Sequence, residues 1–71
     1  MDFKVGDIFK ARDGELKIIS SESGKYGQVF ICQILSGFYW NQGKKYTKNS
    51  ITEVTYMFLL TDIKTNRLRK I

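Results

Sequence analysis

Apolar residues in this chain recur mainly at every second position, in short runs separated by glycine and polar turn residues. Successive side chains of a strand point to opposite faces, whereas an amphipathic helix repeats about every 3.6 residues. β-branched and aromatic residues, which favour strands, are prominent. The sequence therefore predicts an all-β fold over residues 1–71: a single domain built as a small, strongly bent barrel of five to six short antiparallel strands.

The most specific local signal is the dipeptide Asp13-Gly14, which separates two apolar runs at residues 8–11 and 16–19. A two-residue Asp-Gly loop accepts the positive φ angles that a tight hairpin requires. We therefore expect these two residues to close the first hairpin and a polar loop to follow over residues 20–27.

Residues 28–35 carry apolar side chains at both odd and even positions, which indicates a central strand that is either covered on both faces or curled inside a barrel. After it, the sequence predicts turns at Ser36-Gly37 and at residues 41–43, a last long strand over 54–60, a loop over 61–66 and a short final strand over 67–71. Residues 50–53 have the spacing of a helix capping box. They form either a single 3₁₀ turn or the entrance of the last long strand.

Short strands joined by one tight hairpin resemble the SH3-like barrels. Within that group, Val-Gly-Asp-Ile-Phe at residues 5–9, followed by Gly-Lys-Tyr-Gly-Gln-Val at residues 24–29, resembles the two halves of the KOW pattern. In that pattern a Gly-Asp opens the first strand and a Gly-x-x-Gly-x-Val opens a later one. The halves lie farther apart here, because a complete hairpin separates them. The resemblance implies a module that binds RNA, DNA or protein rather than a catalyst.

The single cysteine, Cys32, excludes an internal disulfide and suits a reducing compartment. The longest apolar stretch, residues 56–60, is far shorter than the roughly 20 residues that span a bilayer. Residues 2–4 lack the apolar character of a signal peptide. We therefore expect a cytoplasmic protein that does not bind membranes. The proline-free composition, rich in lysine and isoleucine, fits an AT-rich source such as a Gram-positive bacterium or its phage.

The residue types that enzymes use are poorly represented. The sequence contains no histidine, so no imidazole is present to act as a general base or metal ligand. Cys32, between Ile31 and Ile34, is typical of a buried thiol. The carboxylates are scattered, and the closest spaced, Asp13 and Glu15, flank a predicted turn. We predict no catalytic residue, no metal site and no cofactor.

The whole net charge of +5 lies in the second half of the chain. Residues 1–35 hold five Lys/Arg against five Asp/Glu, whereas residues 36–71 hold seven against two. The same half carries the run Phe-Tyr-Trp-Asn-Gln-Gly-Lys-Lys-Tyr-Thr-Lys at residues 38–48. Basic and flat side chains together suit a polyanion with stackable faces, which indicates RNA or DNA as the partner. Such a charge is also an ordinary aid to solubility.

Three consecutive aromatic residues on a strand cannot all face one core. Either Phe38 and Trp40 point inward with Tyr39 outward, or the reverse. On the nucleic-acid hypothesis, an outward aromatic residue and Tyr46 stack on bases while nearby basic residues contact phosphates. The expected nucleic-acid contacts are Tyr39, Trp40, Lys44, Lys45, Tyr46, Lys48, Lys64, Arg67 and Arg69.

The terminal basic residues Lys64, Arg67, Arg69 and Lys70 allow two interpretations. Charges on an edge strand discourage sheet-to-sheet pairing, and they can equally contact a phosphate backbone. A protein-binding module is the alternative function, for example a phage-encoded or mobile-element-encoded inhibitor of a host protein, because exposed Tyr, Trp and Arg also anchor protein interfaces. A subunit of a larger assembly is a third possibility. The salt dependence of binding distinguishes a nucleic-acid partner from a protein partner, since phosphate contacts weaken steeply with ionic strength.

Overall fold

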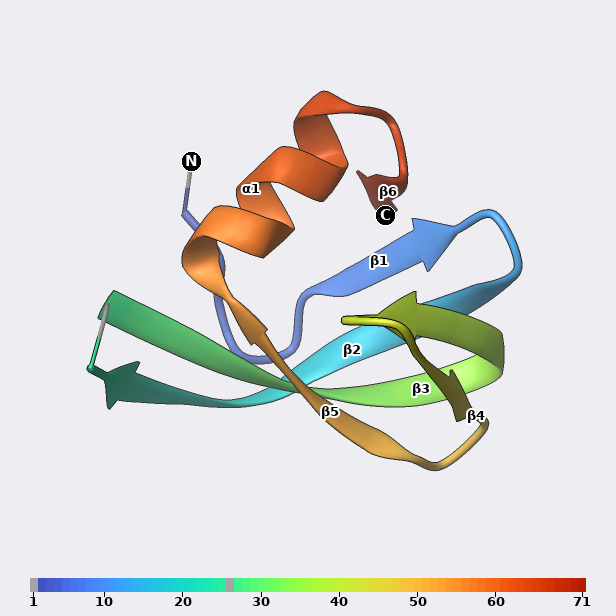
Figure 1. Cartoon of the computed structure of the whole chain (residues 1–71), viewed down its shortest axis with the longest axis horizontal. Coiled ribbons are helices and arrows are strands. Elements are labelled where there is room, and N and C mark those ends of the chain that lie inside the picture. The colour runs from blue at the N-terminus through green and yellow to red at the C-terminus, as the bar shows by residue number, and fades with distance from the viewer. Residues whose placement is uncertain (1, 26) are drawn as a thin grey trace.

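The computed structural model, which describes residues 2–25 and 27–71, contains six strands and one short helix (Figure 1). In chain order the elements are β1 (Ile8–Ala11), β2 (Gly14–Gly24), β3 (Gly27–Asn41), β4 (Lys44–Thr47), β5 (Ile51–Thr55), α1 (Tyr56–Lys64) and β6 (Leu68–Lys70). All the strand pairs are antiparallel. The prediction of a small all-β fold is confirmed.

Strand β3 is the centre of the sheet. The strands follow the order β4-β3-β2-β1-β6, and β5 pairs with β3 outside this path. The fifteen residues of β3 pair with three other strands. One edge of β3 pairs with β2, while on the other edge its first half pairs with β5 and its last four residues pair with β4. The central strand predicted over residues 28–35 is confirmed, although only its even positions 30, 32 and 34 are buried and positions 29, 31, 33 and 35 are half-buried. The turn expected at Ser36-Gly37 is instead a position inside this continuous strand, where Gly37 has a φ of 63°.

The first hairpin closes one residue earlier than predicted. Lys10 pairs with Glu15, so the two loop residues between β1 and β2 are Arg12 and Asp13. Gly14 lies in β2 and is not among the residues with positive φ. Glycine is required here because the backbones of β2 and β3 lie close together: a Cβ on Gly14 would lie 2.8 Å from the backbone nitrogen of Phe38. The Phe38 N–H also donates to the Asp13 carbonyl at 3.0 Å, which fixes the hairpin tip against β3.

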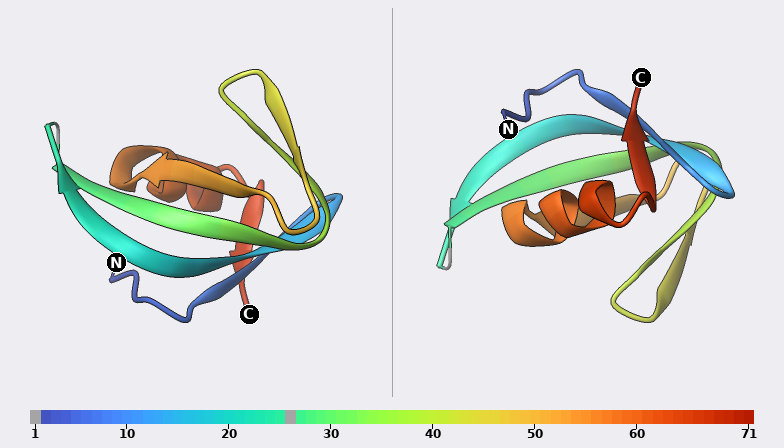
Figure 2. Two further views of the ribbon diagram at one scale, coloured as in Figure 1. Left: turned by 90° about the horizontal axis from the view of Figure 1, so that it is seen from below. Right: turned by 90° about the horizontal axis from the view of Figure 1, so that it is seen from above.

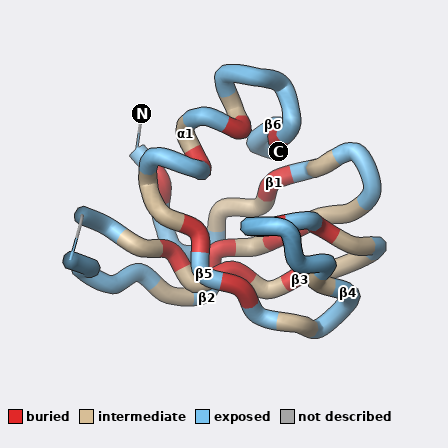
Figure 3. Tube along the Cα trace, in the orientation of Figure 1, coloured by how far each residue is buried: buried red, intermediate tan, exposed pale blue. Residues whose placement is uncertain are grey.

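The polar segment predicted as a loop over residues 20–27 is mostly strand. Residues 20–24 continue β2 and pair with residues 27–31 of β3. Residues 21–24 of β2 and 27–28 of β3 are exposed and extend beyond the core as a ribbon (Figure 3), so polarity reflects exposure and not the absence of a strand. Tyr26, which belongs to the second half of the KOW-like pattern, lies outside the described residues.

The turn predicted at residues 41–43 is confirmed. Asn41 pairs with Lys44, and the two residues between them, Gln42 and Gly43, have φ angles of 53° and 77°. Two successive positive φ angles make a turn whose twist matches the flanking strands. The β3–β4 hairpin projects away from the rest of the molecule (Figure 2).

The prediction of a long strand over residues 54–60 is wrong after Thr55. Residues 56–64 form α1, and the Thr55 hydroxyl caps it by accepting a hydrogen bond from the Phe58 N–H at 3.3 Å. The helix includes the first four residues of the loop expected over 61–66. The strand-entrance interpretation of residues 50–53 is confirmed, because β5 begins at Ile51. Residues 56–60 are apolar at every position, a pattern that does not distinguish a strand from a helix.

The core lies between the sheet and α1, which connects β5 to the short final strand β6 (Figures 1 and 3). Cys32 is fully buried there, as predicted, and burial raises the pKa of its thiol to about 12. The buried apolar residues are Phe3, Phe9, Leu16, Ile18, Phe30, Cys32, Ile34, Tyr39, Val54, Leu59 and Leu68. Within the described ranges, no helix has the length and apolar character needed to cross a membrane.

Candidate functional site

Cross-strand pairing on the β3–β4 hairpin decides which aromatic residues face outward. Tyr39 pairs with Tyr46 and is 6% exposed, whereas Trp40 pairs with Lys45 and is 50% exposed. Of the two arrangements that the sequence allows, the structure has Tyr39 inward. The expectation that Tyr39 offers its ring to a base is therefore wrong, because the core covers it. Trp40 is the aromatic residue that remains accessible.

A hydrogen bond from α1 explains the inward position of Tyr39. The Tyr39 hydroxyl donates to Oδ2 of Asp62 at 2.6 Å, and Asp62 is itself only 7% exposed. Burial, with the hydrogen bond to Asp62 as the second cause, raises the pKa of Tyr39 well above its usual value of 10. The other carboxylate oxygen of Asp62 faces the Arg67 guanidinium at 3.9 Å. Tyr39 therefore joins the hairpin to the helix.

Trp40 lies on the outer face of the hairpin together with Phe38, Lys45 and Thr47. The Lys45 ammonium lies 4.3 Å from the centroid of the Phe38 ring, within the range of a cation–π contact. This contact occupies the face of Phe38 nearest to Lys45.

The three lysines expected to act together lie in different places. Lys45 is directly opposite Trp40, whereas Lys44 pairs with Asn41 on the other face of the hairpin. There the Lys44 ammonium lies 5.3 Å from the centroid of the Tyr46 ring. Lys48 is exposed in the turn that follows β4. Of the predicted platform, the structure therefore brings together Trp40 and Lys45.

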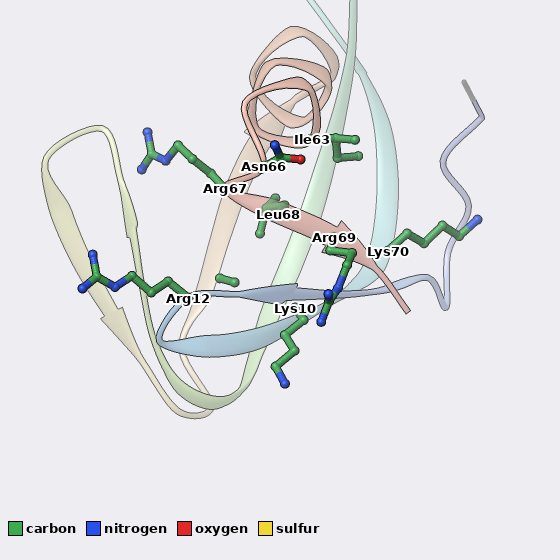
Figure 4. A pocket seen from close by; sticks show the side chains of 9 residues that line it. Lys10, Arg12, Ile63, Asn66, Arg67, Leu68, Arg69 and Lys70 are labelled. Atoms are coloured by element: carbon green, nitrogen blue, oxygen red, sulfur yellow. The ribbon is translucent and has the colours of Figure 1, made fainter.

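Two adjoining hollows lie beside this outer face. The first lies along the paired strands β1 and β6 and is lined by the basic residues Lys10, Arg12, Arg67, Arg69 and Lys70 (Figure 4). The second is lined by the same Arg12 and Arg67, by Asp13, and by all three consecutive aromatic residues, Phe38, Tyr39 and Trp40. Because both hollows share the two arginines, they form one surface feature. We call these two hollows together the basic groove.

The pairing of β1 with β6 places like charges side by side in the basic groove. Lys10 is directly opposite Arg69, and continuing the register beyond the strand ends puts Arg12 across from Arg67. Figure 4 shows the arginine side chains of Arg12 and Arg67 extending to the same side, toward the β3–β4 hairpin. Like charges directly opposite each other destabilise a sheet. The Lys10–Arg69 pair, with Arg12 and Arg67 beyond it, concentrates positive charge at one edge of the sheet.

Few carboxylates compensate these cations. Lys10, Arg12 and Arg69 form no ion pair with residues 2–25 or 27–71. Arg67 faces Asp62 at 3.9 Å, but its side chain is 61% exposed and keeps donors for another partner.

Lys70 is the better paired cation of the groove, with Oδ2 of Asp7 3.4 Å from its ammonium. Glu15, across from Lys10, instead accepts a hydrogen bond from Ser36 at 3.2 Å. Asp13, which is exposed, is the one carboxylate among the described residues that lines the basic groove. The basic groove therefore keeps a clear excess of positive charge.

The sequence analysis missed Lys10 and Arg12, because they belong to the half of the chain with no net charge. The available signal was the alternation of Lys10 and Arg12 on one strand, which matches Arg67 and Arg69 on the strand that returns beside it. Lys64, in contrast, is exposed in the last turn of α1 and lines neither hollow of the basic groove.

Comparisons of this chain with protein-family models, with curated proteins and with solved structures find no match.

Proposed function

We propose that this protein is a non-catalytic module that binds nucleic acid in the basic groove. The observation that carries the proposal is the half-exposed Trp40 in the same hollow as Arg12 and Arg67. Guanidinium groups bind phosphate oxygens through charge-assisted hydrogen bonds, and an indole ring stacks on a base. RNA and DNA present both groups together.

The chemistry of the basic groove supports binding rather than catalysis. Its ionisable groups are lysines and arginines, with Asp13 at one side and the buried Tyr39, whose pKa is raised, and the sequence supplies no imidazole that would exchange protons near neutral pH. The resemblance of the sequence to SH3-like barrels, KOW-like over residues 5–29, implies the same class of function. The proposed activity requires no cofactor.

A protein partner is the second candidate, and a different surface favours it. Met57 and Phe58 are 64% and 49% exposed in the first turn of α1, and neither lines the basic groove. Adjacent exposed apolar side chains of this size are common anchors of protein interfaces. The two candidates therefore predict different contact surfaces as well as different salt dependence.

Fluorescence anisotropy with labelled oligonucleotides of mixed sequence, single-stranded and duplex, tests the proposal at several salt concentrations. We expect the affinity to fall log-linearly with salt, because bound phosphates release counterions. Replacing Arg12, Arg67 and Arg69 together with Gln should weaken binding and flatten the slope by roughly two to three units, since each neutralised phosphate contributes about 0.7 to 0.9.

The matched control replaces Lys4, Lys44 and Lys48 with Gln. These residues are exposed and line neither hollow of the basic groove, and their loss changes the net charge equally. The control should reduce affinity less and leave most of the salt slope intact. Equal effects of the two triple variants would place the contact outside the groove. Absence of salt-sensitive binding to either oligonucleotide would reject the proposed function and favour the protein partner.

A further inference from the structure

We infer that the basic groove takes a single strand rather than a duplex, with one unpaired base on Trp40 and two successive phosphates at the cation pairs of β1 and β6. This inference rests on the proposed function and specifies its ligand. It follows from which aromatic faces are free and from the order of the cations along the groove.

Trp40 is the most exposed of the aromatic residues among 38–46 and lines the groove. Tyr39 is buried and bonded to Asp62, one face of the half-buried Phe38 is occupied by the Lys45 ammonium, and Tyr46 lies on the other face of the hairpin. A base in a duplex is stacked between its neighbours and has no free face. A duplex would therefore engage the cations and leave Trp40 without a partner.

The cations follow Trp40 in a definite order. The hollow that contains Trp40 is bounded by Arg12 and Arg67, and the adjoining hollow continues past them to Lys10 and Arg69. On each strand the two basic residues are two positions apart, or about 6.6 Å. A sugar-phosphate backbone running from Trp40 along β1 and β6 therefore meets one pair of cations and then the next.

Each pair is suited to one phosphate. Lys10 and Arg69 stand directly across from each other, and neither has a carboxylate within ion-pair distance among the described residues. Arg12 lacks such a carboxylate as well, and Arg67 reaches one at 3.9 Å only. A phosphate between the members of each pair relieves their mutual repulsion, which Glu15 across from Lys10 and Asp62 beside Arg67 offset only in part. A single strand thus satisfies both the cations and the exposed indole.

The intrinsic fluorescence of Trp40 tests this inference directly, because Trp40 is the only tryptophan in the sequence. Three probes are compared at one salt concentration: an oligothymidylate of about eight nucleotides, an abasic oligomer of the same length, and a stable duplex of about twelve base pairs, with affinities compared per phosphate. We expect the oligothymidylate to quench the fluorescence and to bind roughly 5- to 150-fold more tightly than the abasic oligomer, the range that one stacked base supplies. The duplex should bind like the abasic oligomer, without quenching.

Two variants assign the base and the phosphates separately, with binding followed by anisotropy. Trp40→Leu should reduce the affinity for oligothymidylate to that for the abasic oligomer and leave the abasic affinity unchanged. Arg12→Gln should weaken both single-stranded probes by a similar factor. Circular dichroism confirms that each variant folds.

The possible failures are distinguishable. If the duplex binds as tightly as oligothymidylate, or if the abasic oligomer binds equally well, the groove recognises charge alone. The inference then fails while the proposed function stands. If none of the three probes binds, the proposed function fails and this inference fails with it.

Discussion

Both faces of the β3–β4 hairpin carry an aromatic residue, but the one on the inner face is buried and the one on the outer face is half exposed. On the inner face, Tyr39 donates to Asp62, and the Asn41 amide donates to the Thr52 hydroxyl and to the Glu53 carbonyl, both at 2.8 Å. On the outer face, Trp40 is half exposed and the indole has no hydrogen bond to the described residues. One face is held by α1 and β5, and the other faces the basic groove.

This difference shows that the surroundings of an aromatic side chain, rather than its residue type, decide whether it stabilises the fold or stays available to a ligand. Tyr39 and Trp40 are adjacent and chemically alike, but only the inner face meets polar groups that satisfy a buried hydroxyl. The Trp40 ring on the outer face exposes apolar surface to water, which is unfavourable unless a ligand covers it. A binding role is therefore best sought on the face whose side chains have no structural partner.

The comparison predicts its largest effect for alanine substitutions at the two neighbours. Tyr39→Ala should lower the free energy of unfolding by about 3–5 kcal/mol, because it removes a buried ring and deprives the buried Asp62 carboxylate of its hydrogen bond from the Tyr39 hydroxyl. Trp40→Ala should cost less than about 1 kcal/mol in stability, since half of its surface is already in water. Urea unfolding of both variants provides the measurement. Equal losses would mean that Trp40 also belongs to the core.

A smaller change isolates the hydrogen bond on the inner face. Tyr39→Phe keeps the ring but removes the hydroxyl that Asp62 accepts, so we expect a loss of about 1–3 kcal/mol in urea unfolding. Tyr46→Phe is the matched control, because Tyr46 is directly opposite and its hydroxyl makes no hydrogen bond within the described part of the chain. The control should change stability by less than about 0.5 kcal/mol. Similar values for the two variants would contradict the assigned role of Tyr39.

The glycines at the two hairpins sharpen the comparison further. At Gly14 the β3 backbone leaves no room for a Cβ atom. At Gly43 there is open space, but the backbone has a positive φ of 77°. Asn tolerates positive φ better than other residues do, so Gly43→Asn should cost less than about 1 kcal/mol. Gly14→Asn should cost about 1–3 kcal/mol or more, because its Cβ would meet the β3 backbone. Thermal unfolding measures both losses. A larger loss for Gly43→Asn than for Gly14→Asn would mean that Asp13 and Gly14 form the turn after all.

The smallest effect concerns the one well-paired cation of the basic groove. A hydrogen bond from the Lys4 N–H, followed by the contact with Lys70, lowers the pKa of Asp7 below its usual 3.8. Asp7 therefore contributes stability above pH 3.8, and this contribution disappears as the pH falls through its lower folded pKa. Asp7→Asn should reduce stability at pH 7 by no more than about 1 kcal/mol and reduce its loss in acid. An unchanged acid profile would show that Asp7 is not involved.

The sequence predicted the parts of the fold that depend on local patterns. Period two indicated strands, and Asn-Gln-Gly at residues 41–43 indicated a turn, because both signals need only neighbouring residues. The helix over residues 56–64 was missed, since its apolar first turn fits either period and its cap at Thr55 is a single residue. The inward position of Tyr39 depends on Asp62, twenty-three residues away, so no local pattern contains it.

The candidate site was predicted in part for the same reason. Trp40, Lys45, Arg67 and Arg69 were recognisable as basic or aromatic residues of the second half of the chain. Arg12 joins them only through the pairing of β1 with β6, which brings the two ends of the chain together. A count of charge by position in the sequence cannot find a site that two distant strands assemble.

An NMR titration tests the central claim most directly. ¹⁵N-labelled protein is titrated with a short single-stranded oligonucleotide, and the shift of every backbone amide and of the Trp40 indole N–H is followed. The account predicts the largest changes at Trp40, Arg12 and Arg67, and none beyond the general drift at Met57 and Phe58. Changes centred on Met57 and Phe58, or no changes at any concentration, would contradict a nucleic-acid site in the basic groove.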